Sequence, residues 1–440
     1  MENKRITTSG VNGTLAVPTS KSLTHRALII AAFAADASGK PALVRHPLRS
    51  DDTTLTLDAL RRMGYPVEIS ENAADGIEWV QFAGKRLQSR AAASINIHHS
   101  GTSARLLTAV AAVQPRAEVG FIEIDGSERM RERPMQELIE PLMALGAHVL
   151  HQNGFLPIRI AQPIPRTSTQ ALVQVDASKS SQFLSALLLI APLLEGGMNI
   201  RLAGEIASKS YSDMTIEQMR KAGVHVQEIT ENGSLTGYSV EGSQVYSLPE
   251  YAVEGDYSSA SYPLAAAAIT GGSITITNLT KDSPQGDRAI VNILTAFGAE
   301  ASWSAGGLTL VGNTHLRGVD WDMNSCPDIV PTVAVVAMFA DGRSTFRNIE
   351  HLRFKESDRI QAVIENIERL GGKAFVEGTA LVVEPTQNLH GSTILTFEDH
   401  RMAMSFALAG LRIEGVEIEN PACVAKSYPD FWRDFERFCV

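Results

Sequence analysis

Lysine and arginine side chains recur at the start of long apolar runs in this chain of 440 residues. Lys21 and Arg26 open one such run, Arg105 lies in the first turns of the next, and Arg401 opens the last. A helix N-terminus carries free N–H groups and the positive end of the helix dipole, so it attracts anions and disfavours cations. Cations that recur there are explained if an anion binds between them. The pattern therefore predicts a receptor for a small polyanion.

Other basic and hydroxyl side chains lie close to these helix starts. They are Arg129, Arg131 and Arg133 in one cluster, Lys179 before Ser180, Ser181 and Gln182, Lys209 near Tyr211, Arg353, Lys355 and Arg359 among acids, and Lys426 near the C-terminus. Binding a phosphate or carboxylate with micromolar affinity requires a binding free energy of about 8 kcal/mol. An exposed helix end contributes only about 0.3–1 kcal/mol of this. Such affinity therefore requires charge-assisted bonds from Arg and Lys. Each of these residues alone also fits a solvent-facing charge paired with an acid.

Six apolar runs carry these clusters at one end, at a spacing of 70 to 80 residues. They begin at Ser20, Ser100, Ser178, Gly255, Asp328 and Glu398. Each run is too long for an ordinary strand and almost uncharged after its first turn, which is typical of a helix buried on most sides. If the six polar ends came together, they would form one binding site.

A strand, a second helix and a hairpin follow each apolar run in the prediction. The second helix is amphipathic and ends at a glycine, and these glycines, Gly64, Gly146, Gly223, Gly298 and Gly371, recur every 73 to 82 residues. Glycine enters the left-handed region at a helix end without strain. Asn-Gly pairs at 153–154 and 232–233 indicate hairpin turns. The pattern predicts a small α+β module that is used six times.

The two ends of the chain lack complementary pieces of this module. A helical pattern at 429–438 has no hairpin after it, and residues 5–18 contain two strand patterns around Asn12-Gly13 with no helix before them. We therefore expect the N-terminal strands to complete the C-terminal module. Residues 20–253 would form one domain of three modules, and residues 1–19 with 254–440 a discontinuous second domain. Crossings at 19–20 and 252–255 would act as hinges, with substrate between the domains.

Composition restricts the functional class. A net charge of −10 opposes nucleic-acid binding as a global property. No run of 18 apolar residues is uninterrupted and the first ten residues contain no apolar h-region, so we expect neither a membrane span nor a secretory signal. Cys326, Cys423 and Cys439 have no metal or disulfide spacing, which fits a reducing cytosol and argues against a structural metal site. We expect a cytoplasmic, monomeric protein that binds small molecules.

Nine segments, taken in order, resemble the 3-phosphoshikimate 1-carboxyvinyltransferase (EPSP synthase) family. They are PTSKSLTHRA, SGTSARLL, DGSERMRERP, KSSQFLSALL, GDYSSAS, PDIVPTVAVVA, LRFKESDRI, EDHRMAM and AKSYPDFW, and they cover essentially the whole chain. The resemblance implies an α+β enolpyruvyl transferase fold with two domains, each of three βαβαββ-like units. It also implies transfer of the enolpyruvyl group of phosphoenolpyruvate to the 5-hydroxyl of shikimate 3-phosphate, with release of phosphate, on the shikimate pathway to chorismate and aromatic amino acids.

The resemblance further implies which residues contact the two substrates. Shikimate 3-phosphate contacts are implied for Lys21, Ser22, Arg26, Ser180, Ser181, Gln182, Ser208, Tyr211, Asp328, His351 and Lys355. Phosphoenolpyruvate contacts are implied for Lys21, Gly101, Arg129, Gln182, Arg359, Arg401 and Lys426. Both substrates carry a phosphate and a carboxylate, so several cations must converge on them. No metal or organic cofactor is implied, because cationic side chains supply the electrostatic stabilisation.

The implied mechanism is addition followed by elimination through a tetrahedral intermediate. Asp328 corresponds to the base for the hydroxyl and Glu356 to the proton carrier at the methylene carbon, while Lys21 and His400 would assist the leaving phosphate. Such acids lie near cations and still exchange protons, so their environment decides their behaviour. Simpler structural roles stay open: Asp328 also fits a helix N-cap, and Glu356 an i,i+3 partner of Arg359.

One segment departs from the family pattern. His98-His99 stands before SGTSAR where the family has Gly-Asn, so the chain lacks an amide near the implied phosphoenolpyruvate contacts. Adjacent residues on a strand point to opposite faces, so we expect these histidines to share no metal. We expect His99 to replace the amide as a polar contact near Gly101, with a charge that depends on pH.

Two other functions stay open at this point. The related UDP-N-acetylglucosamine enolpyruvyl transferases share the fold but use a mobile-loop cysteine, whereas this chain has no cysteine before Cys326. Cys326 itself is better explained as a buried inert thiol than as a nucleophile. A non-catalytic protein that closes around a phosphorylated metabolite would keep the Arg and Lys side chains without needing Asp328 and Glu356.

Overall fold

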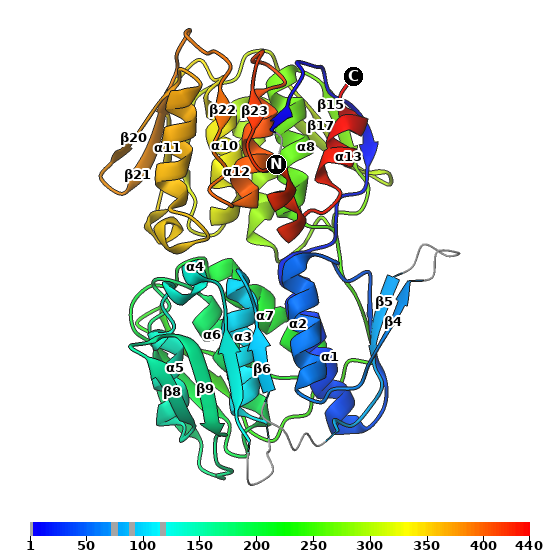
Figure 1. The fold of residues 1–440 in the computed structure, drawn as a ribbon, viewed down its shortest axis with the longest axis vertical. Coiled ribbons are helices and arrows are strands. Elements are labelled where there is room, and N and C mark those ends of the chain that lie inside the picture. The colour runs from blue at the N-terminus through cyan, green and yellow to red at the C-terminus, as the bar shows by residue number, and fades with distance from the viewer. Residues whose placement is uncertain (1–2, 72–77, 88–92, 115–119) are drawn as a thin grey trace. The chain divides into compact units, whose positions relative to one another are not determined.

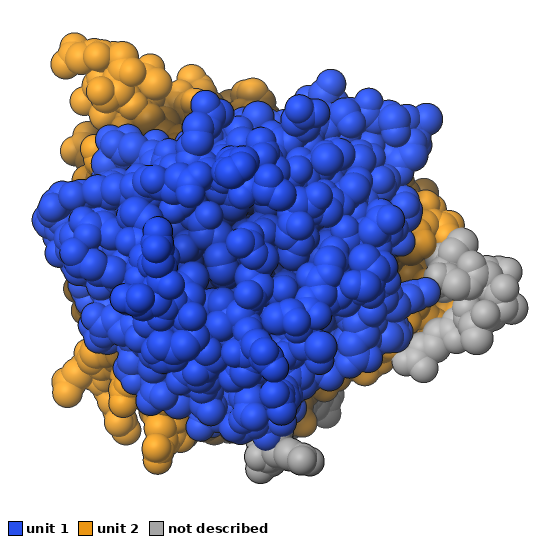
Figure 2. All heavy atoms as spheres, turned by 90° about the horizontal axis from the view of Figure 1, so that it is seen from above, with its two compact units in different colours: residues 1–20, 254–440 blue, residues 21–253 orange. Residues whose placement is uncertain are grey.

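The chain folds into two compact units, each with its own hydrophobic core. The structure is a computed structural model that describes residues 3–71, 78–87, 93–114 and 120–440. Unit 1 comprises Met1–Ser20 and Glu254–Val440, and unit 2 comprises Lys21–Val253 (Figure 2). Every helix in the described ranges is too short or too polar to cross a bilayer.

Unit 2 is built from three four-stranded sheets of one topology. Their strand orders are β14(Glu250–Ala252)-β3(Ala42–Arg45)-β5(Glu78–Phe82)-β4(Val67–Glu71), β6(Ala93–Asn96)-β7(Ile122–Asp125)-β9(Phe155–Gln162)-β8(His148–Gln152), and β10(Ala171–Val175)-β11(Met198–Leu202)-β13(Ser234–Val240)-β12(Gln227–Glu231). In each sheet the first two strands are parallel and the remaining pairs are antiparallel. The shared order means that one module is repeated.

Six main helices accompany these sheets (Figure 1). The apolar ones are α1(Lys21–Ser38), α3(Gly101–Ala112) and α6(Gln182–Ile190), and the amphipathic ones are α2(Asp51–Arg62), α5(Gln136–Ala144) and α7(Lys209–Lys221), with short turns α4(Glu128–Arg131) and η1(Ala191–Leu193). Helix α3 packs against both α1 and α6. All residues of α6 after Gln182 are buried, because an apolar helix with no polar face has to be enclosed by neighbours.

Unit 1 repeats the same module with one shortened sheet. Its sheets are β2(Asn12–Leu15)-β15(Ser273–Ile276)-β17(Gly307–Val311)-β16(Glu300–Ser304), β18(Asp320–Asp322)-β19(Ser344–Arg347)-β21(Ala380–Glu384)-β20(Lys373–Glu377), and β22(Thr393–Ile394)-β23(Glu417–Ile418)-β1(Lys4–Arg5). Its helices are α8(Tyr257–Thr270), α9(Ala289–Phe297), α10(Val330–Ala337), α11(Arg359–Arg369), α12(His400–Ala409) and α13(Phe431–Phe438), with turns η2(Gly286–Arg288), η3(Pro327–Ile329), η4(Glu350–Phe354) and η5(Pro421–Lys426). The apolar helices α8, α10 and α12 pack against one another.

The prediction for the N-terminal strands is half wrong. Strand β1 does complete the last module, where it pairs antiparallel with β23. Strand β2, however, runs parallel to β15 and is the edge strand of the sheet in the fourth module. Asn12-Gly13 therefore lies inside a strand and forms no hairpin turn. The reason is topological: β14, which precedes α8 in the chain, pairs with β3 in unit 2, so the fourth module takes its first strand from the N-terminus.

The two predicted Asn-Gly hairpins are confirmed. Asn153-Gly154 joins β8 to β9 and Asn232-Gly233 joins β12 to β13. Both residues of each pair have positive φ, 51° and 82° in the first and 51° and 79° in the second. This is the backbone of the two-residue turn that matches the twist of antiparallel strands.

Candidate active site

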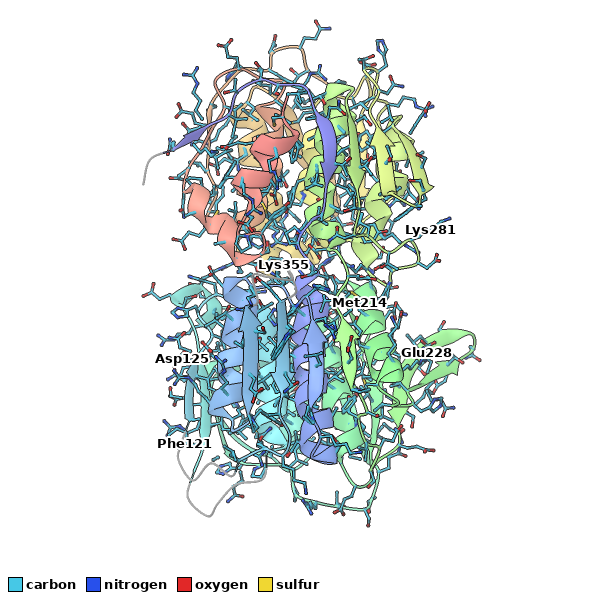
Figure 3. All side chains as sticks on the ribbon, turned by 90° about the vertical axis from the view of Figure 1, so that its right-hand side faces the viewer. Phe121, Asp125, Met214, Glu228, Lys281 and Lys355 are labelled. Atoms are coloured by element: carbon cyan, nitrogen blue, oxygen red, sulfur yellow. The ribbon has the colours of Figure 1, made fainter. Side chains whose placement is uncertain are left out.

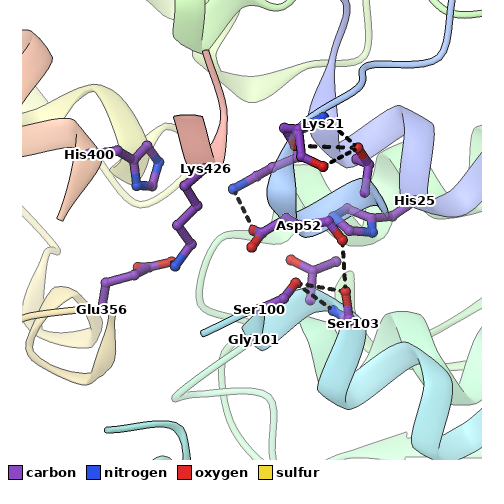
Figure 4. Close-up of polar contacts among 12 residues, drawn as sticks. Lys21, His25, Asp52, Ser100, Gly101, Ser103, Glu356, His400 and Lys426 are labelled. Carbon is purple, nitrogen blue, oxygen red and sulfur yellow. Dashed lines mark hydrogen bonds and ion pairs between the residues drawn. The ribbon is translucent and has the colours of Figure 1, made fainter. Parts of the chain in front are cut away.

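Two polar clusters, one in each unit, contain some of the sequence-predicted residues (Figure 4). We call the first the helix-end cluster: Lys21, His25, Asp52, Thr56, Ser100 and Ser103, at the N-terminal ends of α1, α2 and α3 in unit 2. We call the second the ion-pair cluster: Asp328, Glu356, Arg359, Asp399, Arg401 and Lys426, in unit 1.

Lys21 is held by a carboxylate that is itself fixed in the helix-end cluster. Its Nζ lies 3.1 Å from Asp52 Oδ2, and both side chains are largely buried. The Ser103 hydroxyl donates to the Asp52 backbone carbonyl at 3.3 Å. Asp52 lies in the first turn of α2, behind the N-cap Ser50, where an acid is favoured by the helix dipole. The ammonium group is thereby oriented at the start of α1.

A chain of side-chain hydrogen bonds joins the three helix ends. His25 Nδ1 lies 2.8 Å from Thr56 Oγ1, which lies 2.8 Å from Ser103 Oγ, which lies 2.7 Å from Ser100 Oγ. Burial lowers the pKa of His25 to about 3, so its ring is neutral at physiological pH. Ser100 also caps α3, because its hydroxyl accepts from the Ser103 N–H. The network is neutral and binds the helices together.

Arg26 is almost wholly occupied by protein acceptors. Its nitrogens donate to Thr215 Oγ1 at 2.6 Å, to the Ser22 carbonyl at 2.9 Å, to Ser185 Oγ at 3.2 Å and to the Tyr211 carbonyl at 3.1 Å. The side chain is buried, and this burial lowers its pKa to about 10. At most one N–H of the guanidinium remains for a ligand. Arg26 therefore links α1 to α6 and α7.

The segment 180–182 offers polar groups at the start of α6. Gln182 Nε2 donates to Thr102 Oγ1 at 3.0 Å, while its buried Oε1 has no hydrogen-bond partner within the described part of the chain. Ser181 is buried, and Ser180 is half-buried with its hydroxyl accepting from the Gln182 N–H. An unsatisfied buried amide oxygen is unusual and marks a position that a donor from a ligand would satisfy.

Ser208 and Tyr211 lie where α7 begins. Ser208 has φ 58°, in the left-handed region that a serine rarely adopts. Its carbonyl accepts from the Tyr211 N–H at 3.1 Å, which closes the first turn. Strained residues of this kind are held in place by the surrounding structure and cluster at binding sites.

Gly101 leaves room for two guanidinium groups. A Cβ at this position would lie 2.6 Å from Nη1 of both Arg105 and Arg133, which are buried. Arg129, in contrast, is partly exposed and pairs with Glu132 at 2.9 Å. The sequence pattern places Arg105 at a helix start and Arg133 in one basic cluster with Arg129 and Arg131, whereas the resemblance implies a substrate contact only for Arg129.

The histidine pair does not lie on a strand, and that expectation was wrong. His98 and His99 form a turn between β6 and α3, and His98 has φ 43°. His99 Nδ1 lies 2.8 Å from Ser127 Oγ, at the N-cap of α4. The strand pattern ends earlier, at Asn96, whose side chain accepts from the His98 N–H and closes the turn.

Arg359 is the centre of the ion-pair cluster. Its side chain is 2% exposed, and its nitrogens lie 2.9 Å from Asp328 Oδ1, 2.8 Å from Glu356 Oε2 and 2.8 Å from Asp399 Oδ2. Burial alone would lower the pKa of Arg359, but these three carboxylates raise it above its usual value. The N-cap Asp358 fixes the start of α11 by accepting from the Gln361 N–H, and this places Arg359 as the first helical residue.

Each of the two candidate acids bridges a pair of cations. Asp328 lies between Arg359 and Arg401, with its Oδ2 2.6 Å from Arg401 Nη2. Glu356 lies between Arg359 and Lys426, with its Oε1 3.0 Å from Lys426 Nζ. Asp328 belongs to η3, and α10 has no side-chain N-cap, so the simple capping role does not apply to it. The i,i+3 pairing of Glu356 with Arg359 is present, together with the Lys426 contact.

The remaining predicted residues of unit 1 surround this cluster. His400 is fully buried, with Nδ1 3.6 Å from Asp399 Oδ1. His351 is buried as well, and burial followed by the neighbouring Lys355 lowers its pKa to about 3. Lys355 follows η4 and is half-buried (Figure 3). His351 is therefore a neutral hydrogen-bonding group at physiological pH.

Sequence reasoning missed two of the carboxylates that hold cations, Asp399 and Asp52. Asp399 caps α12 and also binds Arg359, and Asp52 holds Lys21. Both have a capping signal in the sequence, since each lies at the start of a helix pattern.

The sequence also bears on metal binding and cysteine chemistry. The described residues contain no group of three or more His, Cys, Asp or Glu side chains placed to hold an ion. Burial raises the pKa of the Cys326 thiol, as expected for an inert cysteine.

Comparison with known proteins identifies the family. The EPSP synthase (3-phosphoshikimate 1-carboxyvinyltransferase) family model matches residues 6–435. A 3-phosphoshikimate 1-carboxyvinyltransferase of Syntrophobacter fumaroxidans is 41% identical over 439 residues, covering 98% of this chain and 97% of the relative. That of Methanosphaerula palustris is 38% identical over 417 residues, covering 94% of each chain.

Solved structures agree with the sequence comparison. An EPSP synthase structure from Acinetobacter baumannii superimposes with a TM-score of 0.77 at 25% identity, covering 100% of this chain and 98% of the other. The predicted fold class, an α+β enolpyruvyl transferase fold, is thereby confirmed. From its matched length and its relatives, the chain belongs to the EPSP synthase (3-phosphoshikimate 1-carboxyvinyltransferase) family.

Proposed function

We propose that this chain transfers the enolpyruvyl group of phosphoenolpyruvate to the 5-hydroxyl of shikimate 3-phosphate and releases phosphate. Family membership over almost the whole chain supports this reaction. The observation that carries it is the pair of acids, Asp328 and Glu356, each bridging two cations around Arg359. A protein that only captured anions would place the cations without these acids, since acids repel anionic ligands.

In the addition step the acceptor oxygen bonds to C2 of phosphoenolpyruvate. Asp328 takes the proton of the 5-hydroxyl, and Glu356 gives a proton to the methylene carbon, which becomes a methyl group. The product is a tetrahedral intermediate that still carries the phosphate. Both acids are more than four-fifths buried and lie within hydrogen-bond distance of cations, where positioned acid–base groups contribute about 10²–10⁴-fold each.

In the elimination step the C–O bond to phosphate breaks. Glu356 takes a proton back from the methyl group, and the carbon–carbon double bond re-forms. Lys21 and His400 stabilise the departing phosphate in this proposal, and the proton that Asp328 took from the 5-hydroxyl leaves with that phosphate. The ammonium of Lys21 is oriented for such a role by Asp52. Cationic groups that are fixed before the reaction stabilise developing charge without reorganisation.

We assign the two substrates to different sets of residues. In unit 2, Lys21, Ser22, Ser180, Ser181, Gln182, Ser208 and Tyr211 bind shikimate 3-phosphate, and Arg26 contributes at most one N–H. From unit 1, Asp328, His351 and Lys355 complete these contacts. Phosphoenolpyruvate is bound by Lys21, Gly101, Arg129, Gln182, Arg359, Arg401 and Lys426. The unpartnered Oε1 of Gln182 supports its inclusion in both sets.

The experiment is an assay of phosphate release from phosphoenolpyruvate with each acceptor in turn. We expect release with shikimate 3-phosphate and none with UDP-N-acetylglucosamine. Release only with the second acceptor would assign the chain to the other enolpyruvyl transferases. Binding without release for either acceptor would support a non-catalytic anion-binding protein.

We also propose that the protein is a monomer located in the cytoplasm. Light scattering that gives twice the mass of the 47.5 kDa chain would contradict the monomer.

A further inference from the structure

A buried carboxylate outside the ion-pair cluster is connected to it through one hydroxyl group. Asp287 lies in η2, which packs against α8, α9 and η3. Its Oδ2 accepts a hydrogen bond from the Ser258 hydroxyl, and the Ser258 oxygen in turn lies 3.5 Å from Arg401 Nη2 as an acceptor. Arg401 binds Asp328 at 2.6 Å. A continuous path therefore runs from Asp287 to the proposed base.

The second carboxylate oxygen of Asp287, Oδ1, is not hydrogen-bonded within the described part of the chain. Oδ1 is buried without a hydrogen-bond partner among the described residues, and within that same part of the chain Asp287 makes no ion pair. Asp287 as a whole is 5% exposed. An ionised carboxylate in such surroundings loses its hydration without compensation. A neutral carboxylic acid loses far less, so the geometry favours the protonated form.

The charged groups around Asp287 have a surplus of negative charge. Asp328 from η3 and Asp256 at the start of α8 face it and raise its pKa, and the Arg401 guanidinium from α12 lowers its pKa. Helix α9 contributes no titratable side chain in the sequence AIVNILTAF. Arg288 follows Asp287 in the turn η2, and its guanidinium donates a hydrogen bond to the Lys281 carbonyl oxygen.

Burial, and after it the Asp328 carboxylate, raises the pKa of Asp287 to about 7. The adjoining cluster is balanced, because the cations Arg359, Arg401 and Lys426 face the carboxylates Asp328, Glu356 and Asp399. An ionised Asp287 would therefore make this region net negative, and a neutral Asp287 would leave it balanced. An anionic ligand binds more tightly to the balanced form.

We propose that Asp287 is a positioning residue which, in its neutral form, leaves the positive charge of Arg401 available to phosphoenolpyruvate, and that binding of this anion is accompanied by proton uptake at Asp287. The inference rests on the proposed function, in which Arg401 contacts phosphoenolpyruvate. Asp287 acts on the substrate through the effect of its charge on Arg401 and needs no contact with substrate.

The test is the pH dependence of kcat/KM for phosphoenolpyruvate. Above about pH 7 the free protein must take up a proton to bind the anion, so kcat/KM falls by up to about tenfold per pH unit. The value of kcat falls less, because the bound state already holds the proton. Asp287→Asn keeps the shape and stays neutral, so it should match the unsubstituted protein at pH 6 and exceed it by about tenfold at pH 8.

A matched control and a second variant complete the experiment. Asp434→Asn changes another buried aspartate of unit 1, on α13, which bonds to the Tyr428 hydroxyl, and should leave the pH profile unchanged. Ser258→Ala removes the hydroxyl that donates to Asp287, so the fall in kcat/KM should begin at a higher pH. A kcat/KM that stays flat from pH 7 to about 8.5 in the unsubstituted protein would overturn the inference. Absence of phosphate release at every pH would instead contradict the proposed function.

Discussion

The two clusters use opposite means to hold their polar groups. In the helix-end cluster, neutral partners dominate: His25, Thr56 and Ser103 form a hydrogen-bonded chain, and Lys21–Asp52 is its ion pair. In the ion-pair cluster, acids and cations alternate around Arg359. Neutral networks can bind and orient a ligand over a wide pH range, whereas alternating charges can also exchange protons. In the proposed function the acid–base groups therefore lie in unit 1, whereas unit 2 supplies neutral groups that orient the ligand, together with Lys21.

The largest expected effect is on turnover and comes from the ion-pair cluster. Asp328→Asn keeps the size of the side chain but removes the proposed base, so kcat should fall by about 10²–10⁴-fold. The measurement is phosphate release at saturating substrates. Asp434→Asn, on α13, is the control for losing a buried carboxylate in the same unit. Near-normal turnover of Asp328→Asn would exclude Asp328 as the base and weaken the distinction between the clusters.

A loss of stability should come next. Arg359→Met removes the guanidinium and leaves three carboxylates without their shared cation, which should cost about 3–5 kcal/mol of unfolding free energy. Urea unfolding measures it, and Arg347→Met, at an exposed pair with Asp320, should change stability by less than about 1 kcal/mol. Equal effects of the two variants would show that the buried cluster has no special dependence on its central cation.

The buried histidines give stability a pH dependence. The pKa of His25 is lowered to about 3, whereas a histidine in the unfolded chain titrates near about 6.5. Between these values the unfolded state binds more protons, so the free energy of unfolding rises with pH by up to about 1.4 kcal/mol per unit. His25→Asn should make this rise shallower, and exposed His148→Asn should not. An unaltered slope in His25→Asn would mean that its ring can be protonated in the folded state.

The smallest effect is expected from the neutral network. Thr56→Val keeps the shape but removes the hydroxyl between His25 and Ser103, and should cost about 1–3 kcal/mol because both partners stay buried. The KM for shikimate 3-phosphate should rise more than kcat falls, since this network orients binding groups. A fall in kcat at unchanged KM would contradict the binding role and place this neutral network in the chemistry.

The sequence predicted the repeated helices and strands better than it predicted which strands pair with each other. Apolar helices such as α6, and amphipathic helices that end close to a glycine such as α7, follow from local pattern and are where expected. Strand β2 is different: which sheet it joins depends on the course of β14, more than 200 residues away, and local pattern carries no such information. A local turn can also override a strand pattern, as it does at His98-His99.

The same limit applies to the candidate site. Cations at helix starts were visible in the sequence, but two of the acids that hold them, Asp399 and Asp52, were not predicted as part of the site. Asp399 and Asp52 look like ordinary capping residues until the fold brings Arg359 and Lys21 to them. Asp287 carries no signal at all, because its importance depends on burial and on one missing hydrogen bond.

The most direct test of the central claim follows the methylene protons of phosphoenolpyruvate in heavy water. If Glu356 adds and removes a proton at this carbon, the unsubstituted protein should introduce deuterium into the vinyl group of the product, as read by NMR. Glu356→Gln should lower both deuterium incorporation and phosphate release by about 10²-fold or more. Incorporation at an unchanged rate in Glu356→Gln would contradict the assignment of proton transfer to the ion-pair cluster.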